Sequence, residues 1–290
     1  MPQYLVAVYH PDNYDPIRRS RIDAHREGKR EAAAKGQLSM RTRMKTMGRT
    51  IWTMAQVLAI SIGFLVPNAA AQPDTYSKMA PVDQYLMEEN AEIQLARSAA
   101  PDSISRDATI LVLRRQGYET AVEGKNGFVC WVGRGWSGMF DWPEFWSPKV
   151  RAADCLNPQA ARSIVPIVSL RARMVMAGRS KAEMVSALKA AFEKKQLPSL
   201  ESGAMDYMMS RTSYLTDQGG HNLPHLMFYT PLKDGKDWGS GAEGSPVMSA
   251  PYWFISPQEQ SQAKGLPPIL VFLIPAPDWS DGMPAGQHSH

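Results

Sequence analysis

The chain has 290 residues and a formal net charge of +4 at neutral pH, but this charge is unevenly distributed. Residues 1–71 contain 11 of the 32 Lys and Arg side chains and only 5 of the 28 Asp and Glu side chains. Residues 72–290 therefore carry a net charge of −2, with both signs interspersed. Because a nucleic-acid interface needs a concentrated basic surface, this balance argues against DNA or RNA as a partner.

Residues 1–43 form a basic prefix in which apolar residues show almost no periodicity. Such a composition is typical of disordered segments, so we expect this prefix to be disordered or to precede the true start at Met44 or Met47. Its residues 2–16, PQYLVAVYHPDNYDP, resemble the opening strand of YCII-related DGPF proteins, which are small cytoplasmic ferredoxin-like domains. The resemblance ends there and implies no function for the rest of the chain.

Residues 44–71 have the three parts of a secretory signal peptide. Basic side chains precede an uncharged apolar run over 57–66, and the segment ends in small residues. This run of ten residues is shorter than the roughly 20 that a membrane-spanning helix needs. We therefore expect cleavage between Ala71 and Gln72, a periplasmic or extracellular location, and no membrane anchor after processing.

Residues 72–280 are predicted to fold as a single α+β domain with an antiparallel sheet. Strands come first, two central helices follow, and further strands end the domain, which is an order that argues against regular βαβ winding. Asn126-Gly127 favours an antiparallel hairpin between the strands on either side of it. Residues 281–290 are expected to be a flexible tail. The predicted elements are a helix over 81–97, strands over 109–113, 118–122 and 128–132, a helical region over 157–178 with a break at Pro166, a helix capped by Ser180 and Glu183, and strands over 205–210, 226–229, 252–255 and 269–274.

Cys130 and Cys155 are the two cysteines of the chain, and both follow the predicted cleavage site. In an oxidising compartment two such thiols favour a disulfide, although a buried Cys130 with an unrelated Cys155 is the simpler alternative. A third hypothesis makes Cys130 a nucleophile with His221 as its base.

Aromatic residues concentrate in the segment after the third predicted strand. Three tryptophans there are interleaved with charged side chains, a mixture that suits a platform for a sugar or a peptide. The alternative is that a long irregular loop needs large side chains to hold it against the domain. The candidate ligand-binding residues are Trp136, Trp142, Trp146, Arg134, Asp141 and Glu144.

Two further motifs point to chemistry only weakly. His221 and His225 could converge on one metal ion through a turn at Pro224, although a third ligand is not evident. Residues 133–138 match G-x-G-x-x-G, but two prolines follow where a dinucleotide site needs a helix.

The sequence thus favours an exported binding or accessory protein of the cell envelope, with a glycan or a peptide as its ligand. The alternative is a metal-dependent hydrolase that uses His221 and His225. Neither a cofactor nor an oligomeric state follows from the residues, and the choice between enzyme and binding protein stays open.

Overall fold

The computed structural model describes residues 76–217, 223–245, 247–253 and 264–285. The prefix over 1–43, the predicted signal peptide and its cleavage site at Ala71 and Gln72 lie outside these ranges, so they stay predictions. Within the described ranges, no helix is both long enough and apolar enough to cross a membrane.

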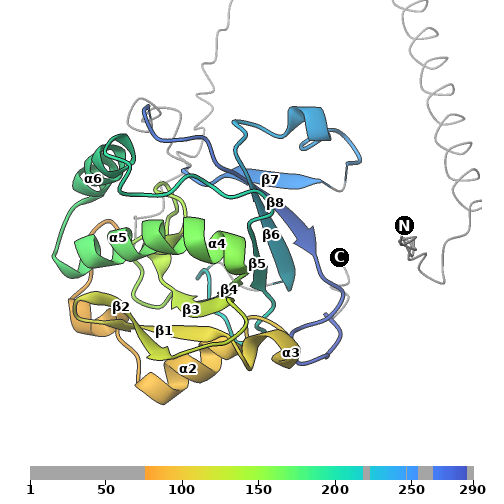
Figure 1. Ribbon diagram of the computed structural model, residues 1–290, viewed down its shortest axis with the longest axis horizontal. Coiled ribbons are helices and arrows are strands. Elements are labelled where there is room, and N and C mark those ends of the chain that lie inside the picture. The colour runs from red at the N-terminus through yellow and green to blue at the C-terminus, as the bar shows by residue number, and fades with distance from the viewer. Residues whose placement is uncertain (1–75, 218–222, 246, 254–263, 286–290) are drawn as a thin grey trace, which may run out of the picture. The chain divides into compact units, whose positions relative to one another are not determined.

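The described residues form a mixed sheet of eight strands at the centre of the fold (Figure 1). The strands are β1 (Thr109–Arg114), β2 (Gly117–Val122), β3 (Val129–Gly133), β4 (Ala152–Leu156), β5 (Met205–Met208), β6 (His225–Thr230), β7 (Met248–Pro251) and β8 (Leu270–Pro275). Their order in the sheet is β2-β1-β3-β4-β5-β6-β8-β7. β1 and β3 are parallel, and all other neighbouring pairs are antiparallel.

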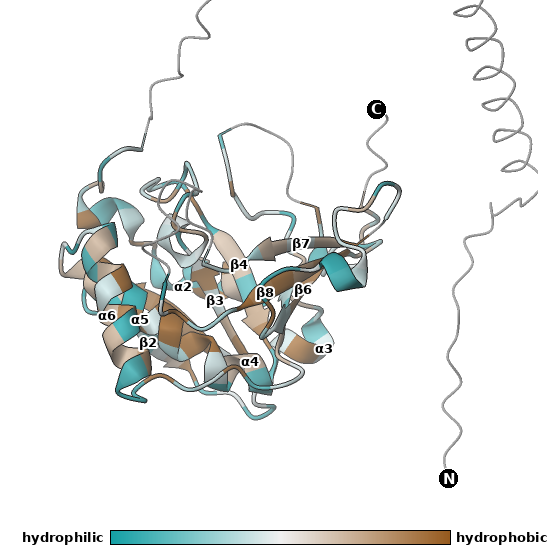
Figure 2. Cartoon of the chain, turned by 90° about the horizontal axis from the view of Figure 1, so that it is seen from above, coloured by the Kyte–Doolittle hydropathy of each residue, from teal (hydrophilic) through white to brown (hydrophobic). Residues whose placement is uncertain are grey.

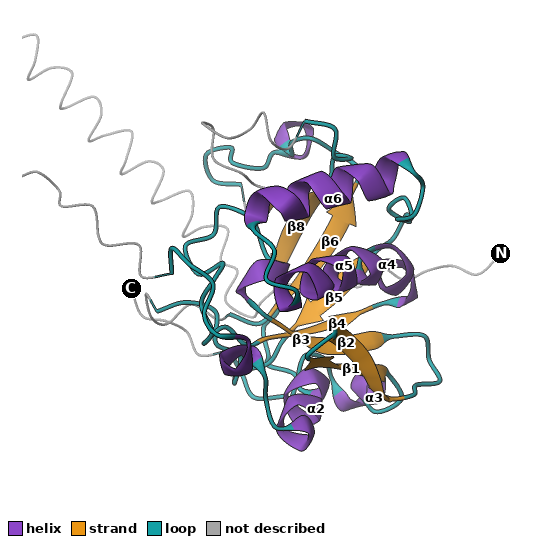
Figure 3. Ribbon diagram, turned by 90° about the vertical axis from the view of Figure 1, so that its left-hand side faces the viewer, coloured by secondary structure: helices purple, strands orange, loops and turns teal. Residues whose placement is uncertain are grey.

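Helices pack on both faces of this sheet (Figure 3). One face is covered by α4 (Pro158–Ser163), α5 (Val165–Met176) and α6 (Lys181–Glu193), and the other carries α2 (Glu89–Arg97) and α3 (Asp102–Ser105). Hydrophobic residues concentrate on the strands between these layers, as Figure 2 shows, so the core lies against the sheet. The 3-10 helices η1 (Val82–Tyr85), η2 (Gly135–Ser137) and η3 (Lys236–Trp238) lie in the connections.

The α+β class is confirmed, but the predicted hairpin between residues 118–122 and 128–132 is wrong. β1 lies between β2 and β3, and the true hairpin joins β1 to β2 through the two-residue turn Arg115-Gln116, directly before Gly117. Gly117 has a φ of +122°, a backbone conformation that residues with a side chain rarely adopt. The turn that specifies this hairpin is therefore Arg115-Gln116, with Gly117 as the first residue of β2.

The segment that was predicted to form the hairpin turn instead carries the chain past β1. The backbone N–H groups of Lys125 and Asn126 donate to the carbonyl of Asp107, just before β1. The side chain of Asn126 accepts from Phe128 and donates to the carbonyl of Ile104. These bonds hold the crossover that places β3 parallel to β1, so the sheet is not purely antiparallel.

The two central helices begin where their capping residues predict. The Oδ1 atom of Asn157 accepts a hydrogen bond of 2.9 Å from the N–H of Ala160, and Ser180 and Glu183 cap α6 reciprocally. Pro166 lies in the first turn of α5, where its missing N–H has no helical partner to lose. The break that Pro166 predicts is therefore the short gap between α4 and α5.

Other boundaries differ from the predictions. The helix expected over 81–97 is divided into η1 and α2. The strand expected over 252–255 is replaced by β7, which ends at Pro251, and residues 254–255 lie outside the described ranges. Within the predicted tail, Asp281 forms an ion pair of 2.7 Å with Arg211, whereas residues 286–290 are not described.

Cys130 and Cys155 form a disulfide between directly opposed positions of β3 and β4. Their Cα atoms are 3.9 Å apart, and both residues are fully buried beneath α2. The favoured pairing is thus present in the structure, and the hypothesis of a free Cys130 nucleophile is wrong.

Non-reducing peptide mapping of the oxidised protein is expected to recover Cys130 and Cys155 in one linked species. The bond closes a loop with a sequence separation of 25, so its loss should lower the free energy of unfolding by about 3 kcal/mol. Urea denaturation of the Cys130→Ser, Cys155→Ser double variant measures this loss. Recovery of two separate, alkylated cysteine peptides from the oxidised protein would contradict the pairing.

Candidate functional site

The aromatic loop, residues 133–148, is anchored by its large side chains. Trp136 is 0% exposed and Trp146 is 7% exposed, so these two rings cannot form the predicted open platform. Trp136 lies edge-on to Tyr85 with ring centroids 4.5 Å apart, and Trp146 lies edge-on to Phe145 at 4.7 Å. A long irregular segment needs such burial to hold its place, which is why the rings point inward. Only Trp142, of the three candidate tryptophans, is half-exposed.

Basic side chains from α5 and α6 hold the aromatic loop in place. The guanidinium of Arg171, on α5, lies 4.4 Å from the ring centroid of Phe140 and donates to the carbonyl of Gly138 at 2.6 Å. The ammonium of Lys181, on α6, lies 4.4 Å from the ring centroid of Phe145. Both arrangements are cation–π contacts within the usual distance. The loop is therefore a fixed wall for whatever lies beside it.

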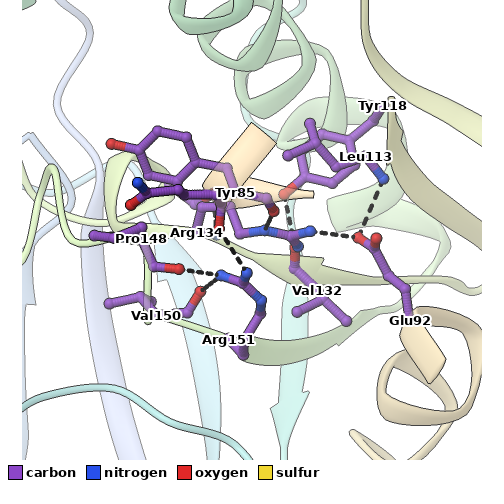
Figure 4. A network of polar contacts seen from close by, with 11 residues as sticks. Tyr85, Glu92, Leu113, Tyr118, Val132, Arg134, Pro148, Val150 and Arg151 are labelled. Atoms are coloured by element: carbon purple, nitrogen blue, oxygen red, sulfur yellow. Dashed lines mark hydrogen bonds and ion pairs between the residues drawn. The ribbon is translucent and has the colours of Figure 1, made fainter. Parts of the chain in front are cut away.

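The predicted charged partners of the platform also have structural roles. Arg134 is fully buried and forms an ion pair of 2.9 Å with Glu92 of α2, and its Nε atom donates to the carbonyl of Tyr85 at 2.9 Å (Figure 4). Glu144 is buried and accepts from the hydroxyl of Thr216. Asp141 is half-buried. Arg134 and Glu144 hold the loop and α2 in position, so these two side chains are not free to bind a ligand from solvent.

A cavity of about 270 Å³ lies between the aromatic loop and the α4–α5 face of the sheet. Most of its lining is apolar and includes Ile164, Val168, Met208, Met227, Val271 and Leu273. The half-exposed lining residues Met139, Trp142, Leu215 and His225 mark the side on which it meets solvent. Its polar lining is concentrated on neighbouring strands and contains Trp131, Asp154, Asp206 and Tyr229.

Asp154 and Asp206 form a carboxyl pair inside this cavity. Asp154 lies on β4, two residues from Leu156, which pairs directly with Asp206 on β5. Side chains alternate along a strand, so both carboxyl groups point to the same face of the sheet. Asp154 is 7% exposed and Asp206 is 1% exposed, and both residues line the cavity. Two buried carboxyl groups on one face of neighbouring strands disfavour the ionisation of both at once.

Burial dominates the electrostatics of this pair. It raises the pKa of Asp206 to about 7, although hydrogen bonds from Tyr229 and from the backbone of Cys155 act in the opposite direction. Burial and then the charge of Asp206 raise the pKa of Asp154 well above its ordinary value. The Tyr229 hydroxyl donates to Oδ2 of Asp206 at 3.0 Å, and burial raises the pKa of Tyr229 well above its ordinary value. Burial therefore favours the protonated form of both carboxyl groups.

Two glycines of the G-x-G-x-x-G match are explained by close packing. A Cβ atom on Gly133 would lie 2.7 Å from Oδ2 of Asp154, so glycine leaves room for the carboxyl pair. A Cβ atom on Gly135 would collide with the backbone carbonyl of Glu144. These glycines allow the loop to approach β4 and to fold on itself, and no helix opens on them beyond the short η2.

Buried polar atoms at and beside the pair lack hydrogen-bond partners among the described residues. The indole Nε1 of Trp131, which is 3% exposed, has no hydrogen-bond partner among the described residues. Oδ1 of Asp206 likewise receives no hydrogen bond from a donor group in the described part of the chain. His225 lies at the solvent side, where its Nδ1 atom is 2.7 Å from the carbonyl of Leu223. Unpaired buried polar atoms of this kind need an explanation, and a ligand supplies one.

The predicted histidine metal site cannot be assessed as a pair, because His221 lies outside the described residues. His225 is described, and burial lowers the pKa of its imidazole. Among the described residues, no three His, Cys, Asp or Glu side chains come together in a way that could hold a metal ion. Metal binding by His221 and His225 stays a prediction.

Sequence reasoning missed the carboxyl pair, although a signal was present. Asp154 interrupts the strand AADCL and Asp206 interrupts the strand MDYM, and in each case a charged residue occurs where the neighbours are apolar. A charge within a buried strand is costly unless it is paired or functional. What the sequence could not show is that β4 and β5 are adjacent in the register that brings the two carboxyl groups together.

Comparison of the chain with protein-family models, with curated proteins and with solved structures found no match.

Proposed function

We propose that this protein is an exported binding protein that holds a small, largely apolar ligand in the cavity between the aromatic loop and the sheet. The observation that carries the proposal is an apolar cavity whose polar lining is a buried carboxyl pair with an unfilled acceptor atom, Oδ1 of Asp206. The buried disulfide and the predicted signal peptide support export, because disulfides persist in oxidising compartments.

The size and lining of the cavity favour a small ligand over a glycan. About 270 Å³ lies just below the roughly 300–1,000 Å³ of pockets that bind drug-sized molecules. A sugar needs many hydrogen-bonding groups around it, whereas most of this lining consists of apolar side chains. The proposed ligand site therefore lies in the cavity beside the aromatic loop and not on an open platform of tryptophans. Of the three candidate tryptophans, Trp142 is the one that lines this cavity.

Retention of the carboxyl pair is a second argument for function. Two buried carboxyl groups in contact destabilise a fold relative to apolar side chains of similar size, because each loses its hydration. Groups with strongly perturbed pKa values inside a cavity are candidates for a functional site. We therefore place the ligand against Asp154 and Asp206.

A neutral apolar probe tests this proposal. The mature protein, residues 72–290, is expected to bind 1-hexanol, and isothermal titration calorimetry measures the affinity. Trp142→Ala removes a half-exposed wall of the cavity and should weaken binding with little loss of melting temperature. Trp136→Ala is the matched control, since Trp136 is buried outside the cavity lining, and it should lower the melting temperature strongly. Absence of binding by the folded wild-type protein would refute the proposal.

Acid–base catalysis by the same pair is a second candidate function. It is favoured by the raised pKa values of Asp154 and Asp206, since a carboxyl group that keeps its proton can donate while an ionised neighbour accepts in the same reaction. Hydrolysis of a panel of chromogenic esters and peptides tests it. Activity that disappears in Asp206→Asn, in a variant that still binds 1-hexanol, would favour catalysis over binding alone.

A further inference from the structure

We infer that the cavity selects a small apolar amine and binds it as an ammonium ion against the Asp154–Asp206 pair. This inference rests on the proposed binding function and names the ligand class of the same site.

The carboxyl pair has no basic side chain to neutralise it among the described residues. Neither Asp154 nor Asp206 forms an ion pair with a basic side chain in the described part of the chain. Arg134 is the basic residue in the cavity lining, and its guanidinium is already engaged by Glu92 and by the carbonyls of Tyr85 and Val132. A buried anionic site without a cation is complementary to a ligand that brings one.

The site offers hydrogen-bond acceptors that suit an ammonium group. An ammonium group is a donor of three hydrogen bonds, and carboxyl oxygens are the acceptors that bind it most strongly. Oδ1 of Asp206 is an acceptor without a donor, while Tyr229 fixes the other oxygen of the same carboxyl group. The remaining wall is apolar and accommodates an aliphatic or aromatic body. The cavity thus matches one amine on a small apolar frame.

Binding of an ammonium ion changes the number of protons that the carboxyl pair holds. The pKa of Asp206 is raised to about 7, so this carboxyl group holds a proton in acidic solution and loses it at higher pH. Binding an ammonium ion below pH 7 therefore drives one proton from the pair into solution, and the bound site is neutral overall. Near pH 8 the pair has already lost that proton, so binding releases none.

Other titratable groups face the pair and must be separated from it. Burial raises the pKa values of Tyr118, Tyr229 and Tyr252, so these phenols stay neutral throughout the range of interest. Glu92 compensates the charge of Arg134. His225 gains a positive charge in acid and would also repel an ammonium ion. The variant His225→Gln removes this competing explanation.

The test compares n-hexylamine with 1-hexanol, its neutral counterpart, by isothermal titration calorimetry of residues 72–290 between pH 5 and pH 8. At pH 8 the amine is expected to bind about tenfold more tightly or better, because charge-assisted hydrogen bonds exceed neutral ones. Below about pH 7 its affinity should fall by up to about tenfold per pH unit. Titration at pH 6 in two buffers of different ionisation enthalpy should report about one proton released. His225→Gln should retain this behaviour.

Asp154→Asn and Asp206→Asn are expected to lose the preference for n-hexylamine over 1-hexanol. Equal binding of both compounds by the wild type would overturn the inference while leaving the binding proposal intact. A preference for the amine that persists in both variants would also overturn it, since the cation would then be recognised elsewhere. Binding of neither compound would refute the binding proposal and the inference together. Circular dichroism of each variant confirms that it is folded.

Discussion

The variant Glu92→Gln is expected to lower the free energy of unfolding by about 3–5 kcal/mol, because it leaves the buried guanidinium of Arg134 without a counter-charge. Both side chains are almost completely buried, with exposed fractions of 0% for Arg134 and 1% for Glu92. Glutamine preserves the shape and can still accept from the N–H of Leu113, which donates to Glu92 at 3.1 Å. The loss therefore reports the charge and not the volume.

The same helix supplies a matched control. Glu89 pairs with Arg114 at 2.9 Å, but their side chains are 45% and 41% exposed, so Glu89→Gln should cost less than about 1 kcal/mol. Urea denaturation at pH 7 measures both variants. Combining Glu92→Gln with Arg134→Met should cost less than the sum of the two single changes, since the double variant leaves no buried charge alone. Equal losses for Glu92→Gln and Glu89→Gln would show that the buried pair contributes nothing special.

Glu92 also illustrates how far the sequence leads. It lies on an amphipathic helix, which places one face of α2 against the sheet, but the helix pattern does not show which acidic residue faces inward. The partner of Glu92 is 42 positions further along the chain, in a loop with no repeating pattern. Local capping rules located α4 and α6 because those signals involve residues three or four apart. Long-range pairs carry no such local signal.

The hairpin error has the same cause. Asn126-Gly127 is a strong turn signal, and the chain does turn there, with a φ of +79° at Gly127. Whether a turn joins neighbouring strands or carries the chain across another strand depends on which segments pack beside the turn. Here the carbonyl of Asp107 accepts hydrogen bonds from two N–H groups of the crossover, and β1 lies between β2 and β3. The strands were predictable from composition, whereas their order was not.

Stability that falls as the pH rises is the expected signature of the Asp154–Asp206 pair. The pKa of Asp206 is raised from about 4 in the unfolded chain to about 7 in the folded protein, chiefly by burial. Between these values the folded state binds more protons than the unfolded state, so the free energy of unfolding decreases with increasing pH. The decrease is on the order of 4 kcal/mol between about pH 4 and pH 7, and it levels off above.

Replacement of Asp206 by Asn should remove most of this dependence, because an amide keeps the shape and can accept from Tyr229 without losing a proton. At pH 8 we expect Asp206→Asn to be more stable than the wild type, and at pH 4 the two should be similar.

Asp217 is the opposite case: hydrogen bonds from Tyr214, Tyr76 and Lys149 lower its pKa to about 2. Asp217→Asn should therefore lose stability near neutral pH, where the carboxylate is stabilising, and leave the dependence caused by Asp206 unchanged. Urea denaturation at pH 4–8 distinguishes these cases, and a wild-type stability that increases from pH 5 to pH 8 would contradict the raised pKa of Asp206. A gain in stability at pH 8 together with a loss of amine binding would mean that the pair is retained for its ligand at the expense of the fold.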